Sequence, residues 1–477
     1  MTFNYKYNRC LPLFVVALAV FASCRKQVEL GPPVTLVTAS NVFRNDNFAI
    51  GAQLSLYSQM QAQNYPYYLH RNTGLSSDEL TTYSTNQNDK NLYLNSLIAT
   101  TDAQDASINT WSPTYNYIYQ ANSIIEGLQT YSGVSEKVKN QLSGESYFLR
   151  GLYYFNLVNL YGDVPLITST DYKVNSVMPR TAKDAVYRQI VNDIKKAASL
   201  LSSTYVDAAN GPTTERVRPT TWAAAALLAR TYLYMGKPDS AEIQANIVIG
   251  NTSQFSLLTD LNKVFLKNSS EAIWQLALPG ASFYTNDGYI FILTASPVNA
   301  SLNNLALNAQ LLSVFEANDQ RKANWVKAFT SGTSTWYYAF KYKDNNKATS
   351  VNEYTMMLRL AEQYLIRSEA RLQQGNTAGC LADLNVIRRR AGLADYSGQT
   401  DQASLLNAIA HERQVELFTE GDRWFNLKRT GTIDAVMGGP AGACKAKGGT
   451  WDSHSQLYPI PVSDIQVNNN IIQNKGY

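Results

Sequence analysis

Three carboxylates, Glu412, Glu416 and Glu420, recur at four-residue intervals near the C-terminus of the chain. That spacing places them on one face of a predicted helix. Paired carboxylates do the acid–base work of glycoside hydrolysis, at a separation of about 5 Å in retaining enzymes. Basic side chains interleave with these carboxylates at intervals suited to ion pairs, however: Arg413, Arg423 and Arg429. We therefore interpret the carboxylates as part of a scaffold and predict no catalytic residue.

The histidines and cysteines do not follow a pattern that would hold a metal ion or a reactive thiol. The sequence has 3 His and 4 Cys, and it contains neither a Cys-x-x-Cys pair nor a Gly-x-Ser-x-Gly nucleophile elbow. The glycine-rich stretch 437–449 lacks the Gly-Lys-Ser/Thr sequence of a phosphate-binding loop. We therefore predict no metal and no cofactor, while a disulfide between Cys380 and Cys444 stays open.

The side chains best suited to binding a ligand are aromatic. The chain contains 31 Tyr, and Asn and Gln are plentiful. A ring stacks on the face of a sugar while amides bond its hydroxyls, so this composition suits a glycan. We predict the following glycan-binding rings, chiefly Tyr67, Tyr68, Tyr284, Trp325, Trp336, Tyr337 and Tyr338, with Tyr65, Tyr83 and Tyr289 as further candidates.

These aromatic candidates have an alternative role, since each ring could instead pack inside the protein. Strand alternation would place Trp336 and Tyr338 on one face and Tyr337 on the other, so at most part of this group can be exposed together. Four other rings lie in helical segments, and the family resemblance described below implies that they pack in the core: Trp111, Tyr154, Tyr161 and Trp424.

The N-terminus has the features of an export signal. Lys6 and Arg9 precede an apolar run, residues 11–21, that is too short to span a bilayer permanently. Small residues then lead to Cys24, and this junction resembles a bacterial lipobox. We predict a signal peptide over residues 1–23, lipidation of Cys24 and an extended tether over 24–40.

The rest of the chain must position the aromatic candidates, and its periodicity is mostly helical. Apolar residues at three- and four-residue spacing predict a mainly α fold. Two stretches, 222–242 and 360–385, combine small residues and Tyr with a glycine, Gly236 or Gly375, that would end the first helix in a left-handed cap. Such tetratricopeptide-like pairs bury a continuous core only when they stack.

Helical periodicity fades over residues 251–355. We therefore expect a helical N-terminal region at 41–250, a loop-rich irregular lobe at 251–355, and a C-terminal region at 356–477 that is helical to about residue 430. The formal net charge of +4 leaves no strongly basic footprint for nucleic acid.

Several ordered blocks of residues resemble a known family. They are Ser77-Asp78-Glu79-Leu80, the segment 144–166 with Phe148-Leu149-Arg150 and Tyr161-Gly162-Asp163-Val164-Pro165, and the segments 358–393, 411–431 and 457–477. Through these blocks the chain resembles the SusD/RagB family over nearly its whole length. It departs from the family pattern at Asn469-Asn470, where an Asn-Pro pair is usual.

This resemblance implies a lipid-anchored protein on the outer face of the outer membrane. Such a protein captures oligosaccharides without catalysis and hands them to a SusC-like TonB-dependent transporter, which it covers as a lid. Calcium is bound in some members, but no Asp-rich loop here demands it. The alternatives are a surface scaffold that binds peptides along its repeat groove and a secreted helical glycoside hydrolase. The glycan itself is not specified.

Overall fold

The computed structural model describes residues 38–278, 280, 282–300 and 302–477. The expected signal peptide 1–23, Cys24 and most of the tether 24–40 lie outside these residues. Helices dominate the described chain, so the prediction of a mainly α fold is confirmed.

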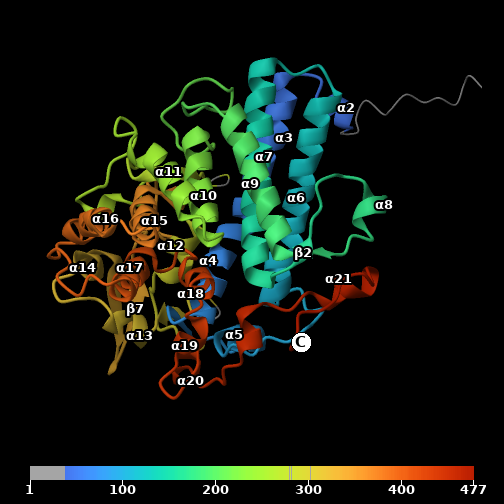
Figure 1. Cartoon of the computed structure of the whole chain (residues 1–477). Coiled ribbons are helices and arrows are strands. Elements are labelled where there is room, and N and C mark those ends of the chain that lie inside the picture. The colour runs from blue at the N-terminus through green and yellow to red at the C-terminus, as the bar shows by residue number, and fades with distance from the viewer. Residues whose placement is uncertain (1–37, 279, 281, 301) are drawn as a thin grey trace, which may run out of the picture.

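The helices of the N-terminal half are α2 Ala39–Val42, α3 Asp46–Ala62, α4 Tyr65–Ser76, α5 Gln87–Tyr93, α6 Ala106–Thr130, α7 Glu136–Tyr161 and α9 Lys183–Leu200. The long helices α3, α6, α7 and α9 run side by side (Figure 1). α7 contacts both α6 and α9, and its second half is buried at every position from Phe148 to Tyr161. The short helix α8, Tyr172–Asn175, lies between β2, Val164–Pro165, and its antiparallel partner β3, Arg180–Thr181.

The next helices extend this layer into a stack that includes the C-terminal region. They are α10 Thr221–Tyr234, α11 Pro238–Ile249, α15 Leu360–Gln373, α16 Thr377–Arg390 and α17 Gln402–Leu417. α9 packs on α10, α10 on α11, α11 on α15, and α15 on both α16 and α17. Helices that are far apart in the sequence therefore share one continuous core, as stacked helix pairs require.

The two glycines predicted to end helices do so in the same way. Gly236 follows α10 with a φ of +65°, and Gly375 follows α15 with a φ of +79°. One residue further on, the Lys237 amide donates to the Tyr232 carbonyl over 2.9 Å, and the Asn376 amide donates to the Arg371 carbonyl over 2.9 Å. This hydrogen bond across the helix end is a Schellman cap, which needs a left-handed residue and therefore favours glycine.

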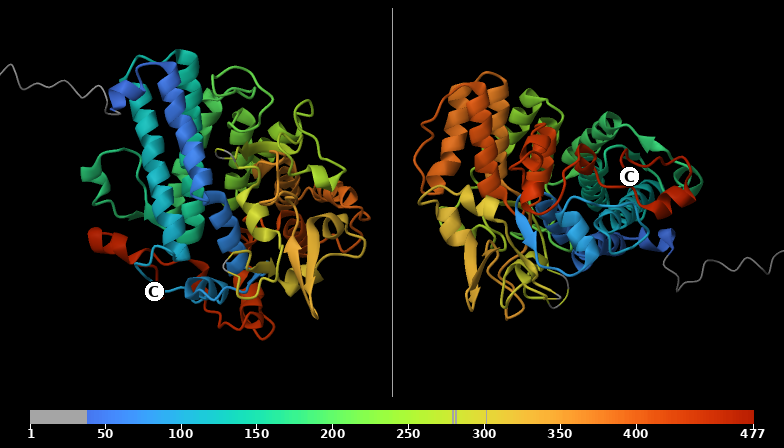
Figure 2. Two further views of the ribbon diagram at one scale, coloured as in Figure 1. Left: turned by 180° about the vertical axis from the view of Figure 1, so that it is seen from behind. Right: turned by 90° about the horizontal axis from the view of Figure 1, so that it is seen from below.

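Short elements fill the segment 251–355, for which an irregular lobe was expected. They are η1 Leu261–Lys263, β4 Ala272–Leu276, α12 Asn286–Phe291, β5 Leu305–Leu307, α13 Ala309–Ser313, α14 Gln320–Trp325, β6 Val326–Ser331 and β7 Ser334–Ala339. β6 and β7 form a hairpin that projects from this segment (Figure 2). β5 pairs with β1, Leu80–Thr82, and β4 pairs with β8, Thr355–Arg359, so antiparallel ladders tie the segment to both helical halves.

The C-terminal tail crosses back to the N-terminal helices (Figure 1). It contains α18 Arg423–Arg429, α19 Ile433–Met437, α20 Ala443–Ala446, η2 Ser453–Gln456 and α21 Val462–Val467. The Tyr458 amide donates to the Leu160 carbonyl at the end of α7, over 2.9 Å. Within the described part of the chain, no helix is both long and apolar enough to cross a bilayer.

The four rings expected in the core are all buried there: Trp111, Tyr154, Tyr161 and Trp424. Tyr161 contacts the Trp111 ring edge-on at 4.8 Å between centroids. Trp111 lies in α6 and Tyr161 ends α7, so the core placement that the family resemblance implied is confirmed for both.

Two helical glycines give a test of this packing. A Cβ added at Gly127 in α6 would lie 1.9 Å from the buried ring of Phe43, whereas one added at Gly51 in α3 would meet nothing within 4 Å. We expect Gly127→Ala to lower the free energy of unfolding by about 1–2 kcal/mol, because overpacking outweighs the gain in helix propensity. Gly51→Ala should raise it by up to about 1 kcal/mol. Urea unfolding of both variants measures the two changes in the free energy of unfolding. Equal changes would contradict the close contact between Gly127 and the Phe43 ring.

Candidate functional site

Trp325 is not available to a ligand, and its prediction as a glycan-binding ring was wrong. Its side chain is 0% exposed, and its indole N–H donates to the Leu261 carbonyl over 2.9 Å. The Phe265 ring packs edge-on against it, and the Lys341 ammonium lies 5.0 Å from the ring centre. Trp325 ends α14 facing inward, because the segments around Leu261 and Lys341 cover it from both sides.

The neighbouring aromatic candidates lie on the β6–β7 hairpin. Trp336 pairs with Phe329 and Tyr338 pairs with Lys327, so these four side chains share one face and Tyr337 lies on the other. The predicted alternation is therefore confirmed. Trp336 and Tyr338 are half-buried, while Tyr337 is 44% exposed.

Trp336 meets a ring from a distant part of the sequence. Tyr83 packs edge-on against Trp336 at 6.4 Å between centroids, and Phe329 lies 6.5 Å from Trp336. Tyr83 is held in place because its amide donates to the Asn304 carbonyl over 2.8 Å, directly after the β1–β5 ladder. We call Tyr83, Phe329 and Trp336 the hairpin cluster. Partial burial raises the pKa of Tyr83, so its hydroxyl stays protonated and can donate a hydrogen bond.

Phe329 was missed in the sequence, although a local signal identifies it. The turn Ser331-Gly332-Thr333-Ser334 closes the hairpin with a two-residue loop, and Gly332 has a φ of +58°. A two-residue hairpin loop beginning with glycine fixes the register of its strands. Counting outward from that turn pairs Phe329 with Trp336 directly.

A second group of rings lies between α4 and α12. The centroid of the Tyr67 ring is 5.4 Å from that of Tyr68 and 6.4 Å from that of Phe291. Tyr67 and Tyr68 are half-buried, and Phe291 is buried. Near it, Tyr284 and Tyr289 contact each other at 5.2 Å. Tyr65, the first residue of the same α4 turn, is buried in the core instead.

A buried polar contact fixes α12 against α4. His70 Nδ1 and Asp287 Oδ1 are 2.8 Å apart, and both side chains are almost fully buried. The Asn286 amide group also donates to the Gln61 carbonyl, over 3.2 Å. The rings of α12 are therefore carried by a segment that is bonded to the helical scaffold.

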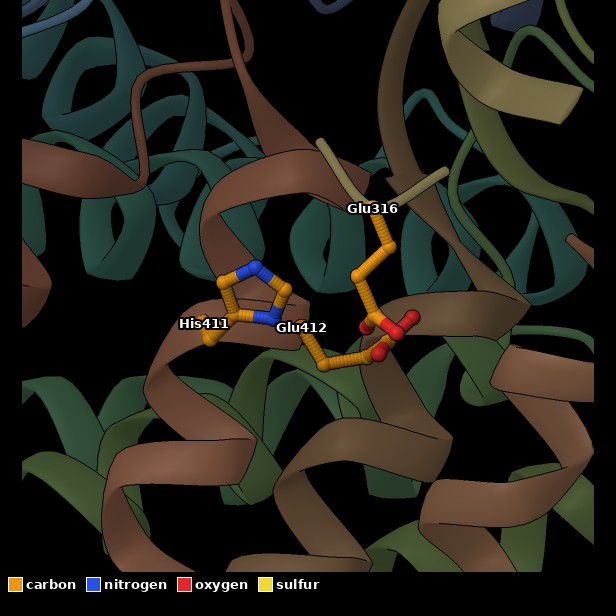
Figure 3. Close-up of side chains that lie close together, drawn as sticks. All are labelled: Glu316, His411 and Glu412. Atoms are coloured by element: carbon orange, nitrogen blue, oxygen red, sulfur yellow. The ribbon is translucent and has the colours of Figure 1, made fainter. Parts of the chain in front are cut away.

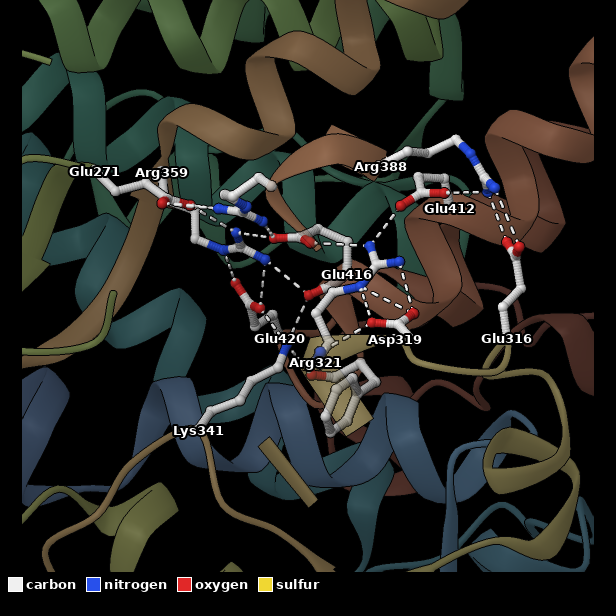
Figure 4. A network of polar contacts seen from close by, with 12 residues as sticks. Glu271, Glu316, Asp319, Arg321, Lys341, Arg359, Arg388, Glu412, Glu416 and Glu420 are labelled. Atoms are coloured by element: carbon white, nitrogen blue, oxygen red, sulfur yellow. Dashed lines mark hydrogen bonds and ion pairs between the residues drawn. The ribbon is translucent and has the colours of Figure 1, made fainter. Parts of the chain in front are cut away.

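Glu412 and Glu416 lie in α17 and are buried in ion pairs, whereas Glu420 lies beyond the end of that helix at Leu417 and is half-buried in its own ion pairs (Figure 4). The prediction that all three share one helix face is therefore wrong for Glu420. Glu412 pairs with Arg321 at 2.5 Å, Glu416 with Arg359 at 2.6 Å, and Glu420 with Arg359 at 2.6 Å. Guanidinium groups around Glu416 hold its pKa well below the usual range despite its burial. A general acid needs a raised pKa, so this group is suited to structure, as the sequence indicated.

One group of potential metal ligands comes together among the described residues, namely Glu316, His411 and Glu412 (Figure 3). Arg388 already contacts both carboxylates, at 2.6 Å to Glu316 and 3.4 Å to Glu412. The His411 Nε2 atom is 2.7 Å from the Val314 carbonyl oxygen and therefore carries the proton. Arg388 pairs with both carboxylates and Arg321 also pairs with Glu412, so these carboxylates already have cationic partners and the group is an ion-pair cluster.

The two remaining cysteines are not bonded to each other. Cys380 in α16 and Cys444 in α20 are both free and buried. The disulfide left open by the sequence is therefore not formed.

Comparisons with known proteins agree with this architecture. Residues 294–477 match a family model described as "SusD family", and residues 46–233 match one described as "Starch-binding associating with outer membrane". The chain belongs to the SusD/RagB family. SusD-like protein P25 of Formosa agariphila is 28% identical over 445 residues, which cover 81% of this chain and 83% of that protein. Starch-binding protein SusD of Bacteroides thetaiotaomicron is 24% identical over 435 residues, covering 73% of this chain and 75% of that protein.

Solved SusD structures share the fold. A SusD superfamily protein from Bacteroides vulgatus superposes with a TM-score of 0.78 at 21% identity, over 91% of this chain and 99% of that one. A structure titled "Laminarin binding SusD-like protein" gives a TM-score of 0.74 at 24% identity, over 91% of this chain and 100% of that one.

Buried charges join the two parts of the chain that match separate SusD family models. Asp78, next to β1, pairs with Arg423 of α18 at 2.7 Å. Arg230 of α10 pairs with Glu362 of α15 at 2.6 Å. Glu79 lies beside Asp78 but has no basic partner within bonding distance, and its Oε1 atom has no hydrogen-bond partner among the described residues.

Glu79 gives a pH-dependent test. Burial, and then the neighbouring Asp78, raise the pKa of Glu79 from 4.5 to about 8. Between pH 4.5 and about 8, Glu79 is protonated in the folded protein and ionised in the unfolded chain. The stability that its raised pKa contributes is therefore fully present below pH 4.5 and is lost as the pH rises through 8.

We expect Glu79→Gln to stabilise the protein relative to wild type increasingly from about pH 5 to pH 8, by up to about 1.4 kcal/mol for each pH unit. Urea unfolding at several pH values measures the difference. The control is Asp395→Asn, which removes one partner of an exposed surface pair with Arg389. Its effect should stay within about 1 kcal/mol throughout. If the difference in the free energy of unfolding between Glu79→Gln and wild type does not change with pH, the raised pKa of Glu79 is contradicted.

Proposed function

We propose that this protein captures oligosaccharides at the cell surface and delivers them, without catalysis, to a SusC-like TonB-dependent transporter of the outer membrane. The hairpin cluster carries the proposal, since Tyr83, Phe329 and Trp336 bring partly exposed rings together from two distant segments. Rings on loops and hairpins that a rigid scaffold positions are a common way to bind a ligand. Membership of the SusD/RagB family supports the same conclusion.

The charges around the hairpin favour a neutral ligand. The arginines and carboxylates of the adjacent scaffold are paired with one another inside the protein, as Arg321 and Glu412 are. Lys327 is the charged side chain that the two hairpin strands contribute on the face of Trp336, so ring stacking and hydrogen bonds carry most of the recognition. One relative is named for starch binding and one solved structure for laminarin binding, and both ligands are neutral glucans. We therefore propose a neutral glucan oligosaccharide as the ligand class.

Replacing Trp336 tests the site. We expect Trp336→Ala to weaken binding of a malto- or laminari-oligosaccharide several-fold, because one stacked ring contributes about 1 kcal/mol or somewhat more. The matched control is Tyr337→Ala, which removes a more exposed ring from the opposite face of the same strand. Its effect on binding should be small.

Isothermal titration measures both affinities, and the melting temperature of each variant shows that the fold is retained. Equal losses for the two variants would place the ligand elsewhere, with Tyr67 and Tyr68 next to be tested. Prolonged incubation should leave the oligosaccharide length unchanged. Turnover that disappears in Glu412→Gln or Glu416→Gln would contradict the absence of catalysis.

We also propose that Cys24 carries the lipid that holds the protein on the outer membrane. The support is the apolar run at 11–21 followed by small residues before Cys24. We expect Cys24→Ser to move the protein from the membrane fraction to the soluble fraction and to abolish incorporation of labelled palmitate. A variant that stays membrane-bound without the label would contradict this anchor.

A further inference from the structure

Lys327 differs from the cations at the two ends of the hairpin, because no carboxylate neutralises it. Its side chain is exposed on β6, and among the described residues its ammonium has no ion-pair partner. Arg321 and Lys341, which flank the hairpin, are instead buried. Their partners are Glu412 and Glu420. Lysines are mostly exposed in proteins, so the surroundings of Lys327 decide whether it has a role.

Lys327 lies on the ring-bearing face of the hairpin, directly opposite Tyr338. The next pair on the same face, two positions closer to the turn, is Phe329 with Trp336. Residues two apart in a strand point to the same face and are about 7 Å apart. Tyr338 therefore lies beside Trp336, close enough for neighbouring units of one oligosaccharide to contact both rings.

Tyr338 offers a second ring on which a sugar can stack. Its side chain is half-buried, and the Phe340 ring packs edge-on against it at 6.1 Å between centroids. Partial burial raises the pKa of Tyr338, so its hydroxyl stays protonated. Among the described residues this hydroxyl has no hydrogen-bond partner, so it is free to donate to a ligand. We call Lys327, Tyr338 and Phe340 the Lys327 cluster.

Positive charge is concentrated around Phe340. The ammonium of Lys327 lies 5.2 Å from the centre of the Phe340 ring, and that of Lys343 lies 4.3 Å from it. Lys343 is held in place because it donates to the Asn324 carbonyl over 2.7 Å. The pKa of Lys343 is lowered to about 8, chiefly by burial; Glu353 offsets part of this shift, and repulsion from Lys327 adds to it. The two cations therefore interact, and Lys327 is the one that faces solvent.

We propose that Lys327 sets the charge selectivity of the glycan site. One sugar unit stacks at Trp336, and the next unit stacks on Tyr338, within reach of the Lys327 ammonium. An anionic group on that second unit, such as a carboxylate, is favoured there, whereas an amino group is repelled. A neutral unit is accepted, so the glucan of the proposed function is the backbone that carries the charged group. The inference rests on that function, because it assigns a specificity-determining residue to the same site.

The expected preference is modest because Lys327 is exposed. An ion pair at an exposed site changes an affinity by up to about five-fold. A carboxylate and an amine shift the affinity in opposite directions, so ligands that differ only in this group should differ by about three-fold or more. Salt screens such interactions, and the preference should disappear in about 1 M sodium chloride.

Isothermal titration with charged trisaccharides tests the proposal. The neutral parent is the malto- or laminari-trisaccharide that the wild-type protein binds. Four probes derived from it carry one carboxylate or one amine, on the reducing-end or the non-reducing-end unit. Both ends are needed because a ligand can run along the hairpin in either direction. For at least one end, we expect the carboxylate probe to bind wild type about three-fold or more tighter than the amine probe at low salt.

Two substitutions of Lys327 and one matched control locate the charge. Lys327→Met keeps an unbranched side chain without the ammonium and should bring the ratio of the two affinities to about one. Lys327→Glu should reverse the preference. The control Ala328→Glu changes the net charge by as much as Lys327→Met, but on the opposite face of the same strand, beside Tyr337. It should keep the wild-type ratio, and the melting temperature of each variant shows that the fold is retained.

Each contrary result has its own meaning. A ratio near one for wild type at both ends overturns the proposal, as does a ratio that Lys327→Met leaves unchanged or that Ala328→Glu shifts equally. In all three cases binding of the neutral trisaccharide remains, and the proposed function stands. Wild-type protein that binds neither neutral trisaccharide would refute the proposed function and the charge selectivity together.

Discussion

The Glu416 carboxylate is shared by Arg359, Arg390 and Arg321, which come from β8, α16 and α14. Such an arrangement costs free energy to desolvate, and it persists because every charge finds partners. Two further bonds cap the end of α17, since the Lys341 ammonium and the Arg359 guanidinium both donate to the Glu416 carbonyl. Cations at a helix C-terminus are favourable for the same electrostatic reason. Removing one partner would leave a buried charge unpaired, at a cost of about 3–5 kcal/mol.

The hairpin depends on this network. Arg321 lies in the first turn of the short helix α14, which ends at Trp325 and leads directly into β6, and Lys341 follows β7. Both ends of the hairpin are thus bonded to the C-terminal helices, Arg321 to Glu412 and Lys341 to Glu420. Burial of Trp325 belongs to the same arrangement, because its ring lies beside the Lys341 ammonium. The ion pairs therefore hold the base of the hairpin that carries the half-buried ring of Trp336, and a preorganised ring loses less entropy when it binds.

Charged and aromatic side chains occupy different parts of the molecule. Charge is concentrated and neutralised inside, around Glu416 and between Asp78 and Arg423. The hairpin cluster, by contrast, offers partly exposed rings on a scaffold whose own charges are paired.

The sequence by itself determined the mainly α fold, the helix ends at Gly236 and Gly375, and the place of Glu412 and Glu416 on one helix. Each of these depends on local spacing, which helical periodicity and glycine conformation translate directly into structure. The alternation of Trp336, Tyr337 and Tyr338 was predictable for the same reason. Only the tertiary structure decided that Trp325 is buried and that Tyr83 meets Trp336, 253 residues away. The exposure of a ring depends on which distant segments pack over it, and no local spacing records that contact.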